Sequence, residues 1–156
     1  MGIATTTPGA IRAALELKIL AITPSFAEFS NITWNPVRTV DPSGSDIRSF
    51  RLLTEPRGID PQGVYGPDGV ESVFDLRIRT AYGGLDDNQV TEIIQSDLHD
   101  LWGAFHPAPG GTASSIPGFI SFGGGFLEVE PADDFQESTD LIVDFVAEVH
   151  YKAAVS

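Results

Sequence analysis

The ten residues Val73–Tyr82, VFDLRIRTAY, carry the strongest structural signal in this chain. Strict alternation of this kind predicts a β-strand with one buried face and one solvent-facing side. The predicted inward side chains are those of Phe74, Leu76, Ile78, Thr80 and Tyr82, and the outward ones those of Asp75, Arg77, Arg79 and Ala81. A second alternating stretch, residues 141–151, is predicted to be another strand, with Leu141 and Val143 beginning its inward face.

Two amphipathic helices are predicted, one on each side of Val73–Tyr82 in the sequence. Thr7 followed by Pro8 is typical of a helix start, and apolar residues follow it at helical spacing. The second helix is predicted after Asp86, because an apolar stripe runs from Val90 to Phe105 and includes Trp102.

The rest of the chain predicts further strands and two long loops. Strands are expected over residues 47–53, 119–122 and 126–129. Residues 55–70 hold three Pro and four Gly, and residues 107–118 are also rich in Pro, Gly and Ser, so both are expected to be loops. Residues 1–156 are interpreted as one α+β domain, with a mostly antiparallel sheet and two helices packed on one face.

Composition narrows the function classes. The 156 residues include no Cys, which excludes disulfides and thiolate metal sites, and no apolar run is long enough for a membrane helix. The net charge is −13. Residues 1–79 hold eight Lys/Arg and nine Asp/Glu, whereas residues 80–156 hold one and thirteen. Such a charge argues against nucleic acid as a sequence-specific partner.

The charged residues of the two alternating stretches allow two interpretations. Asp75, Arg77 and Arg79 are expected to meet Asp144 and Glu148 across the sheet. The contact is either an anion site or a cross-strand ion-pair ladder, and the ladder is the favoured reading. No catalytic, cofactor-binding or metal-binding residues are predicted. Asp97, beside the stripe of the second helix, is expected to reach water or a nearby Arg rather than act as a base.

An acidic segment follows the predicted strand at residues 126–129. Its spacing does not match a calcium-binding loop, and it is interpreted as an acidic loop that is solvated or docked on a basic partner. The residues assigned to this acidic surface are Glu128, Glu130, Asp133, Asp134 and Glu137.

In the order of its predicted elements and in its residue pattern, the chain resembles the tail-terminator, or tail-completion, proteins of long-tailed bacteriophages. The resemblance is carried by the N-terminal helix with Ile11–Leu15, the Pro/Gly-rich stretch and Phe74–Arg79, followed by the amphipathic helix from Val90 to Phe105 and the last strand, LIVDFVAEV (141–149).

The resemblance implies a structural virion protein at the head-proximal end of the tail, assembled in the host cytoplasm, without enzymatic activity or cofactor. Its expected partners are copies of itself in a ring, which the resemblance implies is a hexamer, together with the tail tube protein and a head-completion or neck protein. The resemblance also implies an alternative position for the acidic residues between Glu128 and Glu137, on the lumen of that ring. Arg57, Tyr65 and Asp68 are the expected inter-subunit residues of the 55–70 loop. Two alternatives stay open: a head–tail connector or tail-tube-like protein, and a small α+β ligand-binding or enzyme domain.

Overall fold

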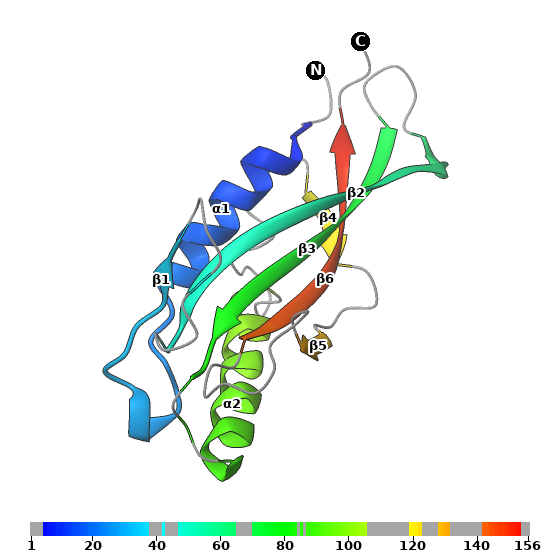
Figure 1. Ribbon diagram of the computed structural model, residues 1–156. Coiled ribbons are helices and arrows are strands. Elements are labelled where there is room, and N and C mark those ends of the chain that lie inside the picture. The colour runs from blue at the N-terminus through cyan, green and yellow to red at the C-terminus, as the bar shows by residue number, and fades with distance from the viewer. Residues whose placement is uncertain are drawn as a thin grey trace.

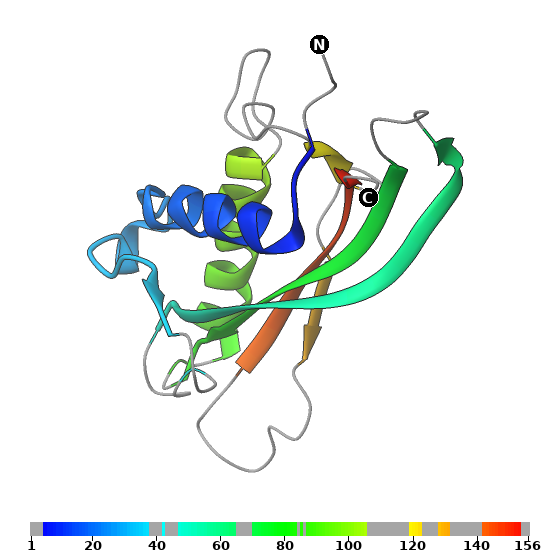
Figure 2. The same cartoon turned by 90° about the horizontal axis from the view of Figure 1, so that it is seen from above.

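A computed structural model shows a curved β-sheet with two helices on one side (Figures 1 and 2). It describes residues 5–37, 42, 47–64, 70–83, 85, 87–105, 119–122, 128–131 and 142–153. The helical elements are α1 (Pro8–Leu20), a short 3₁₀ helix η1 (Ala27–Phe29) and α2 (Asp87–Phe105). The strands are β1 (Asn35–Pro36), β2 (Ser49–Val64), β3 (Val70–Ala81), β4 (Phe119–Phe122), β5 (Glu128–Pro131) and β6 (Ile142–Ala153).

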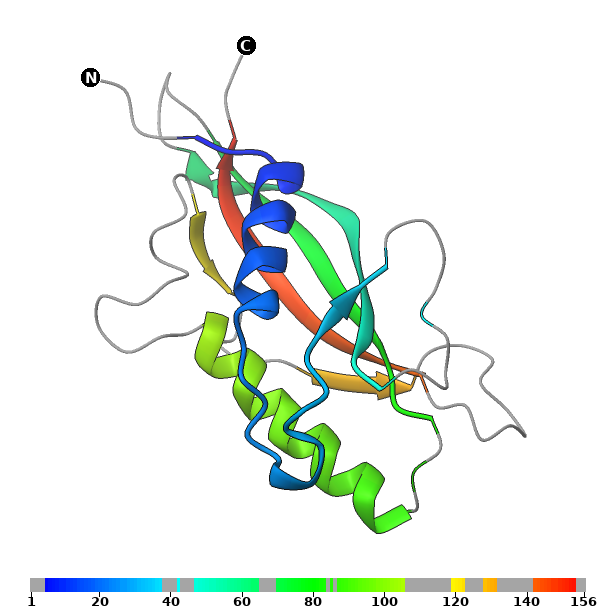
Figure 3. The ribbon, with the colours of Figure 1, turned by 90° about the vertical axis from the view of Figure 1, so that its left-hand side faces the viewer.

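The sheet has the strand order β1-β2-β3-β6-β4, and β5 pairs with β6 on the same edge as β4. The β1–β2 pair is parallel and the other pairs are antiparallel. The α+β class with a mostly antiparallel sheet is therefore confirmed. Figure 3 shows α1 and α2 in front of the strands, so both helices cover the same face.

One apolar core lies between the helices and this face. The alternation of Val73–Tyr82 is confirmed for Phe74, Leu76, Ile78, Thr80 and Tyr82, which are all buried. Ala81 is an exception, because it was predicted to face outward and has no exposed surface. The α1 stripe buries its residues at helical spacing against the same core. The hydroxyl of Thr7 accepts the backbone N–H of Ala10 at 3.2 Å, which caps the helix as its sequence predicts.

The predicted loop at 55–70 is wrong over most of its length. Residues 55–64 belong to β2 and Val70 begins β3, so these residues extend a long hairpin. The backbone N–H of Val37 donates to the Phe50 carbonyl, which points that peptide group towards β1. By strand alternation the nitrogen of Pro56 faces the same edge, where no hydrogen bond to β3 is lost. Register shifts at Pro56/Gly58 and Ile59/Val64 absorb the remaining irregularity.

Three further predictions need correction. Trp102 is 45% exposed and lies outside the core, because the buried face of α2 is set by Ile93, Leu101 and Phe105. The strand predicted at 126–129 is shifted and runs over Glu128–Pro131. The predicted strand at 47–53 is only the first part of β2. The predicted loop at 107–118 lies outside the described residues.

Candidate functional site

A network of charged side chains covers the sheet face opposite the helices. Antiparallel register places Arg79 directly across from Asp144. Arg79 Nε donates to Asp144 Oδ1 at 2.9 Å, and Arg77 Nη1 donates to Asp144 Oδ2 at 3.3 Å. The Asp144 side chain is only 3% exposed, so this carboxylate is held by two guanidinium groups at a nearly dry position.

The same network contains two carboxylates that face one another. Register pairs Asp75 on β3 with Glu148 on β6, and like charges directly opposite are unfavourable. Arg57 on β2 bridges them, since its Nη1 lies 3.1 Å from Asp75 Oδ1 and 3.2 Å from Glu148 Oε2. Arg57 therefore has partners within its own chain, and its predicted inter-subunit role stays a prediction.

His150 joins the network between two glutamates. Its Nδ1 lies 3.0 Å from Glu71 Oε2 and its Nε2 lies 2.7 Å from Glu148 Oε1. Partial burial disfavours the imidazolium, but the hydrogen bonds with Glu71 and Glu148 and their charges outweigh this, and the pKa of His150 is raised. This side chain therefore links β6 to the start of β3 most strongly when it is protonated.

Three arginines of this face, Arg57, Arg77 and Arg79, are engaged by carboxylates. Besides the contacts above, Arg77 Nε donates to Glu55 Oε1 at 2.7 Å. An anion site would need guanidinium groups directed at solvent, and here they are directed at Glu55, Asp75, Asp144 and Glu148. The geometry is that of a cross-strand ion-pair ladder.

A second polar cluster is buried beneath α2. Arg48, Asp97 and Tyr82 have no exposed surface. Arg48 Nε lies 2.9 Å from Asp97 Oδ2 and its Nη2 lies 3.0 Å from Asp97 Oδ1, a bidentate geometry. The Tyr82 hydroxyl donates to Asp97 Oδ2 at 2.6 Å.

Arg48 also fastens the connection between η1 and β1. Its Nη1 donates to the carbonyl oxygens of Phe29 at 2.6 Å and Ile32 at 2.7 Å. One guanidinium group therefore ties Asp97 of α2 to the carbonyls of Phe29 and Ile32, which precede it by more than sixty residues. The tie is structural, because none of its polar atoms is open to a substrate.

Burial dominates the protonation of this cluster. It raises the pKa of Asp97, although the hydrogen bonds from Arg48 and Tyr82 act in the opposite direction. Burial, together with the Asp97 charge, raises the pKa of Tyr82 well above its ordinary value, so the phenol keeps its proton and donates. Asp97 meets an Arg, as the sequence analysis expects.

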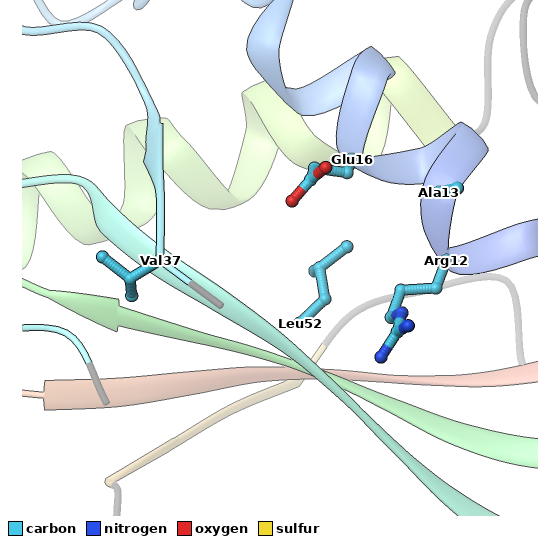
Figure 4. A pocket seen from close by; sticks show the side chains of 5 residues that line it. All are labelled: Arg12, Ala13, Glu16, Val37 and Leu52. Atoms are coloured by element: carbon cyan, nitrogen blue, oxygen red, sulfur yellow. The ribbon is translucent and has the colours of Figure 1, made fainter. Parts of the chain in front are cut away.

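A small pocket lies between α1 and the edge of the sheet (Figure 4). Its volume is about 230 Å³, and it is lined by Arg12, Ala13 and Glu16 of α1 together with Val37 and Leu52. In Figure 4 the side chains of Arg12 and Glu16 extend from α1 towards the sheet. Ligand sites for drug-sized molecules typically enclose roughly 300–1,000 Å³, so this volume suits a single side chain better.

The remaining predicted residues are only partly placed. Tyr65 and Asp68 lie outside the described residues, as do Asp133, Asp134 and Glu137. Glu128 and Glu130 belong to β5, where they pair in register with Val146 and Asp144.

Metal-binding clusters, membrane-spanning helices and sequence relatives indicate no further site in the described residues. Within the part of the chain that the structure describes, no group of three or more His, Asp or Glu could hold a metal ion. None of the described helices is long and apolar enough to cross a membrane. Neither a protein-family model nor a curated protein sequence matches this chain.

Sequence reasoning missed Arg48. It stands just before β2 and falls within the strand predicted at residues 47–53, where a charged side chain gave no sign that it would be buried. Its two partners were visible separately, Tyr82 as an inward residue and Asp97 at the margin of an apolar stripe. A search for a cation to match that Asp was the one available clue.

Proposed function

We propose that this protein is a structural subunit that works by assembling with copies of itself, as a tail-terminator ring at the head-proximal end of a long phage tail. The observation that carries the proposal is that the charged and polar side chains of each cluster bind one another within the described residues. Asp97 is bound by Arg48 and Tyr82, and Arg57 and Arg79 of the sheet face are held by carboxylates. A catalyst needs such groups directed at a substrate.

The order of elements supports the family assignment that the resemblance suggested. A helix precedes a long antiparallel hairpin, an amphipathic helix follows, and a long strand closes the sheet. The excess negative charge of residues 80–156 suits a ring through which DNA passes, because repulsion prevents adhesion. A neck or tail-tube-like role would use the same features.

The test begins with the mass of the purified chain in solution. We expect native mass spectrometry and light scattering to show a discrete closed oligomer, which should be a hexamer if the family resemblance holds. Adding that oligomer to growing tubes of the cognate tail tube protein should then stop elongation at one end. A monomer at all concentrations that also leaves tube growth unchanged would overturn the proposal.

A further inference from the structure

His150 lies where three strands of the sheet are paired side by side. Register places it across from Val73 of β3 on one side and from Ser121 of β4 on the other. The side chain of His150 is 19% exposed and that of its partner Glu71 is 14% exposed. Water therefore has limited access to their contact, and a hydrogen bond lost there is not freely replaced by solvent.

Both ring nitrogens of His150 face carboxylate oxygens. Nδ1 lies 3.0 Å from Glu71 Oε2, and Nε2 lies 2.7 Å from Glu148 Oε1. An ionised carboxylate only accepts hydrogen bonds, whereas a neutral imidazole has one N–H and one bare nitrogen. Only the imidazolium, with an N–H at each nitrogen, makes both hydrogen bonds. Loss of the proton leaves a lone pair facing a carboxylate, so one of the two contacts must open.

The charged groups around His150 come from the strands on either side of it and from β6 itself. They are Arg57 of β2, Glu71 and Asp75 of β3, and Glu148 and Lys152 of β6. The four residues of β4, FISF, include no titratable side chain. Two basic side chains thus accompany three carboxylates, and the His150 proton balances the third carboxylate.

The Glu71 contact is the one that joins two strands. Glu148 belongs to β6, as His150 does, whereas Glu71 is the second residue of β3. Two residues beyond His150, the Lys152 carbonyl accepts the backbone N–H of Thr6 at 2.8 Å. Figure 1 shows that the end of β6 and the start of α1 lie at the same end of the sheet. The Glu71–His150 contact therefore holds β3 to the strand end that binds the residue before the α1 cap.

We propose that His150 is a pH-dependent clamp on this end of the sheet. Its imidazolium holds β3 and β6 together, and loss of the proton releases Glu71 and loosens the attachment of Thr6 to β6. Because the pKa of His150 is raised above its ordinary value of 6.5, the clamp is complete below that pH and opens as the pH rises through the folded-state pKa. The clamp needs no ligand besides the proton, and it does not rest on the proposed function.

Hydrogen exchange of the Thr6 amide, measured by NMR from about pH 6 to about pH 8.5, tests the clamp. Each rate is divided by the intrinsic exchange rate at that pH, and comparison with the buried Phe145 of β6 removes changes in global stability. We expect the relative protection of Thr6 to fall roughly threefold or more, with the midpoint of the imidazole titration. The fall is modest because a partly exposed ion pair contributes little free energy.

Glu71→Gln should produce a clamp that needs no proton. Its side-chain amide can donate to the bare nitrogen of a neutral imidazole, while the other nitrogen donates to Glu148. We expect Thr6 in this variant to stay protected and to lose the pH dependence. Glu71→Ala removes the contact, so Thr6 should exchange faster at every pH in the range. Glu55→Gln is the matched control, since Glu55 is an exposed carboxylate on β2 that contacts Arg77, and it should keep the wild-type pH dependence.

Two results would overturn the clamp. In the wild-type chain, the relative protection of Thr6 could stay constant while the His150 imidazole titrates. In Glu71→Gln, the pH dependence could persist unchanged, which would assign it to a group other than the Glu71–His150 contact. Neither result bears on the ring, which the mass of the oligomer and the growth of tail tubes test separately.

Discussion

Two features of Arg48 are unfavourable for the free energy of folding. Its backbone φ is 63°, in the left-handed region that a non-glycine residue occupies at an expense of roughly 1–3 kcal/mol. Its charge is fully buried, which is unfavourable unless it is paired and hydrogen-bonded. Asp97 and the carbonyls of Phe29 and Ile32 meet that need, so this cluster is a place where single substitutions have large effects.

Removing the Asp97 carboxylate should therefore strongly destabilise the folded protein. In Asp97→Ala the Arg48 guanidinium stays buried without its counter-charge, and we expect the free energy of unfolding to fall by about 3–5 kcal/mol. Urea denaturation measures it. Glu92→Ala, an exposed change on the same helix, is the control and should stay within about 0.5 kcal/mol of wild type. A loss below 1 kcal/mol for Asp97→Ala would contradict a charged, buried pair.

His150 should titrate above its ordinary value of 6.5. Because the folded-state pKa is raised, the His150 contribution to stability is fully present below the unfolded pKa and is lost as pH rises through the folded pKa. An NMR titration of the imidazole measures the pKa directly. Glu71→Gln should lower it, since that hydrogen bond to a carboxylate is a main cause of the shift. An unchanged pKa in Glu71→Gln would show that the Glu71 contact does not set it.

In helix α2 the predicted apolar stripe is wrong at one residue. The sequence places Trp102 and Phe105 on one stripe, yet Phe105 is 1% exposed and Trp102 is 45% exposed. The helix is rotated so that Asp97 faces the core, because Arg48 and Tyr82 bind its carboxylate there. Binding this carboxylate turns Trp102 outward.

Truncating these two aromatic residues should give unequal results. Phe105→Ala should cost about 3–5 kcal/mol, because it leaves a cavity in the core. Trp102→Ala should cost about 1 kcal/mol or less, because much of the side chain is already in water. Thermal and urea denaturation of the two variants measure the difference. Equal losses would place Trp102 in the core after all.

In the part of the chain that the structure describes, both helices and the sheet contribute to one apolar core. Ile11 and Leu15 of α1, Ile93 of α2 and Phe145 of β6 belong to one buried cluster. No element of this set has an apolar interior of its own, so the helices and the sheet should lose their structure together.

Unfolding should therefore follow one transition in the described part of the fold. Trp34 is buried against Phe50, with ring centroids 5.8 Å apart, and reports on the sheet edge. In a Trp102→Phe background, Trp34 fluorescence and far-ultraviolet circular dichroism should have the same midpoint at a fixed protein concentration. Separate midpoints would show that the helices and the sheet edge unfold independently.

The sequence by itself determined the class of the fold and the faces of its main strands. The alternation of Val73–Tyr82 and the cap at Thr7 depend only on neighbours in the chain, and both were readable for that reason. The pairing of Arg79 with Asp144 was also foreseeable, since two alternating strands present their charges on one face.

Only the tertiary structure decided the rest. Residues 55–64 became strand although they include Pro56, because the nitrogen of Pro56 faces the edge of the sheet rather than β3. Arg48 found Asp97 because β2 and α2 pack together, and a contact between residues 49 positions apart leaves no periodic trace in sequence. Burial and strand order depend on which elements meet in space, and local propensity does not encode that.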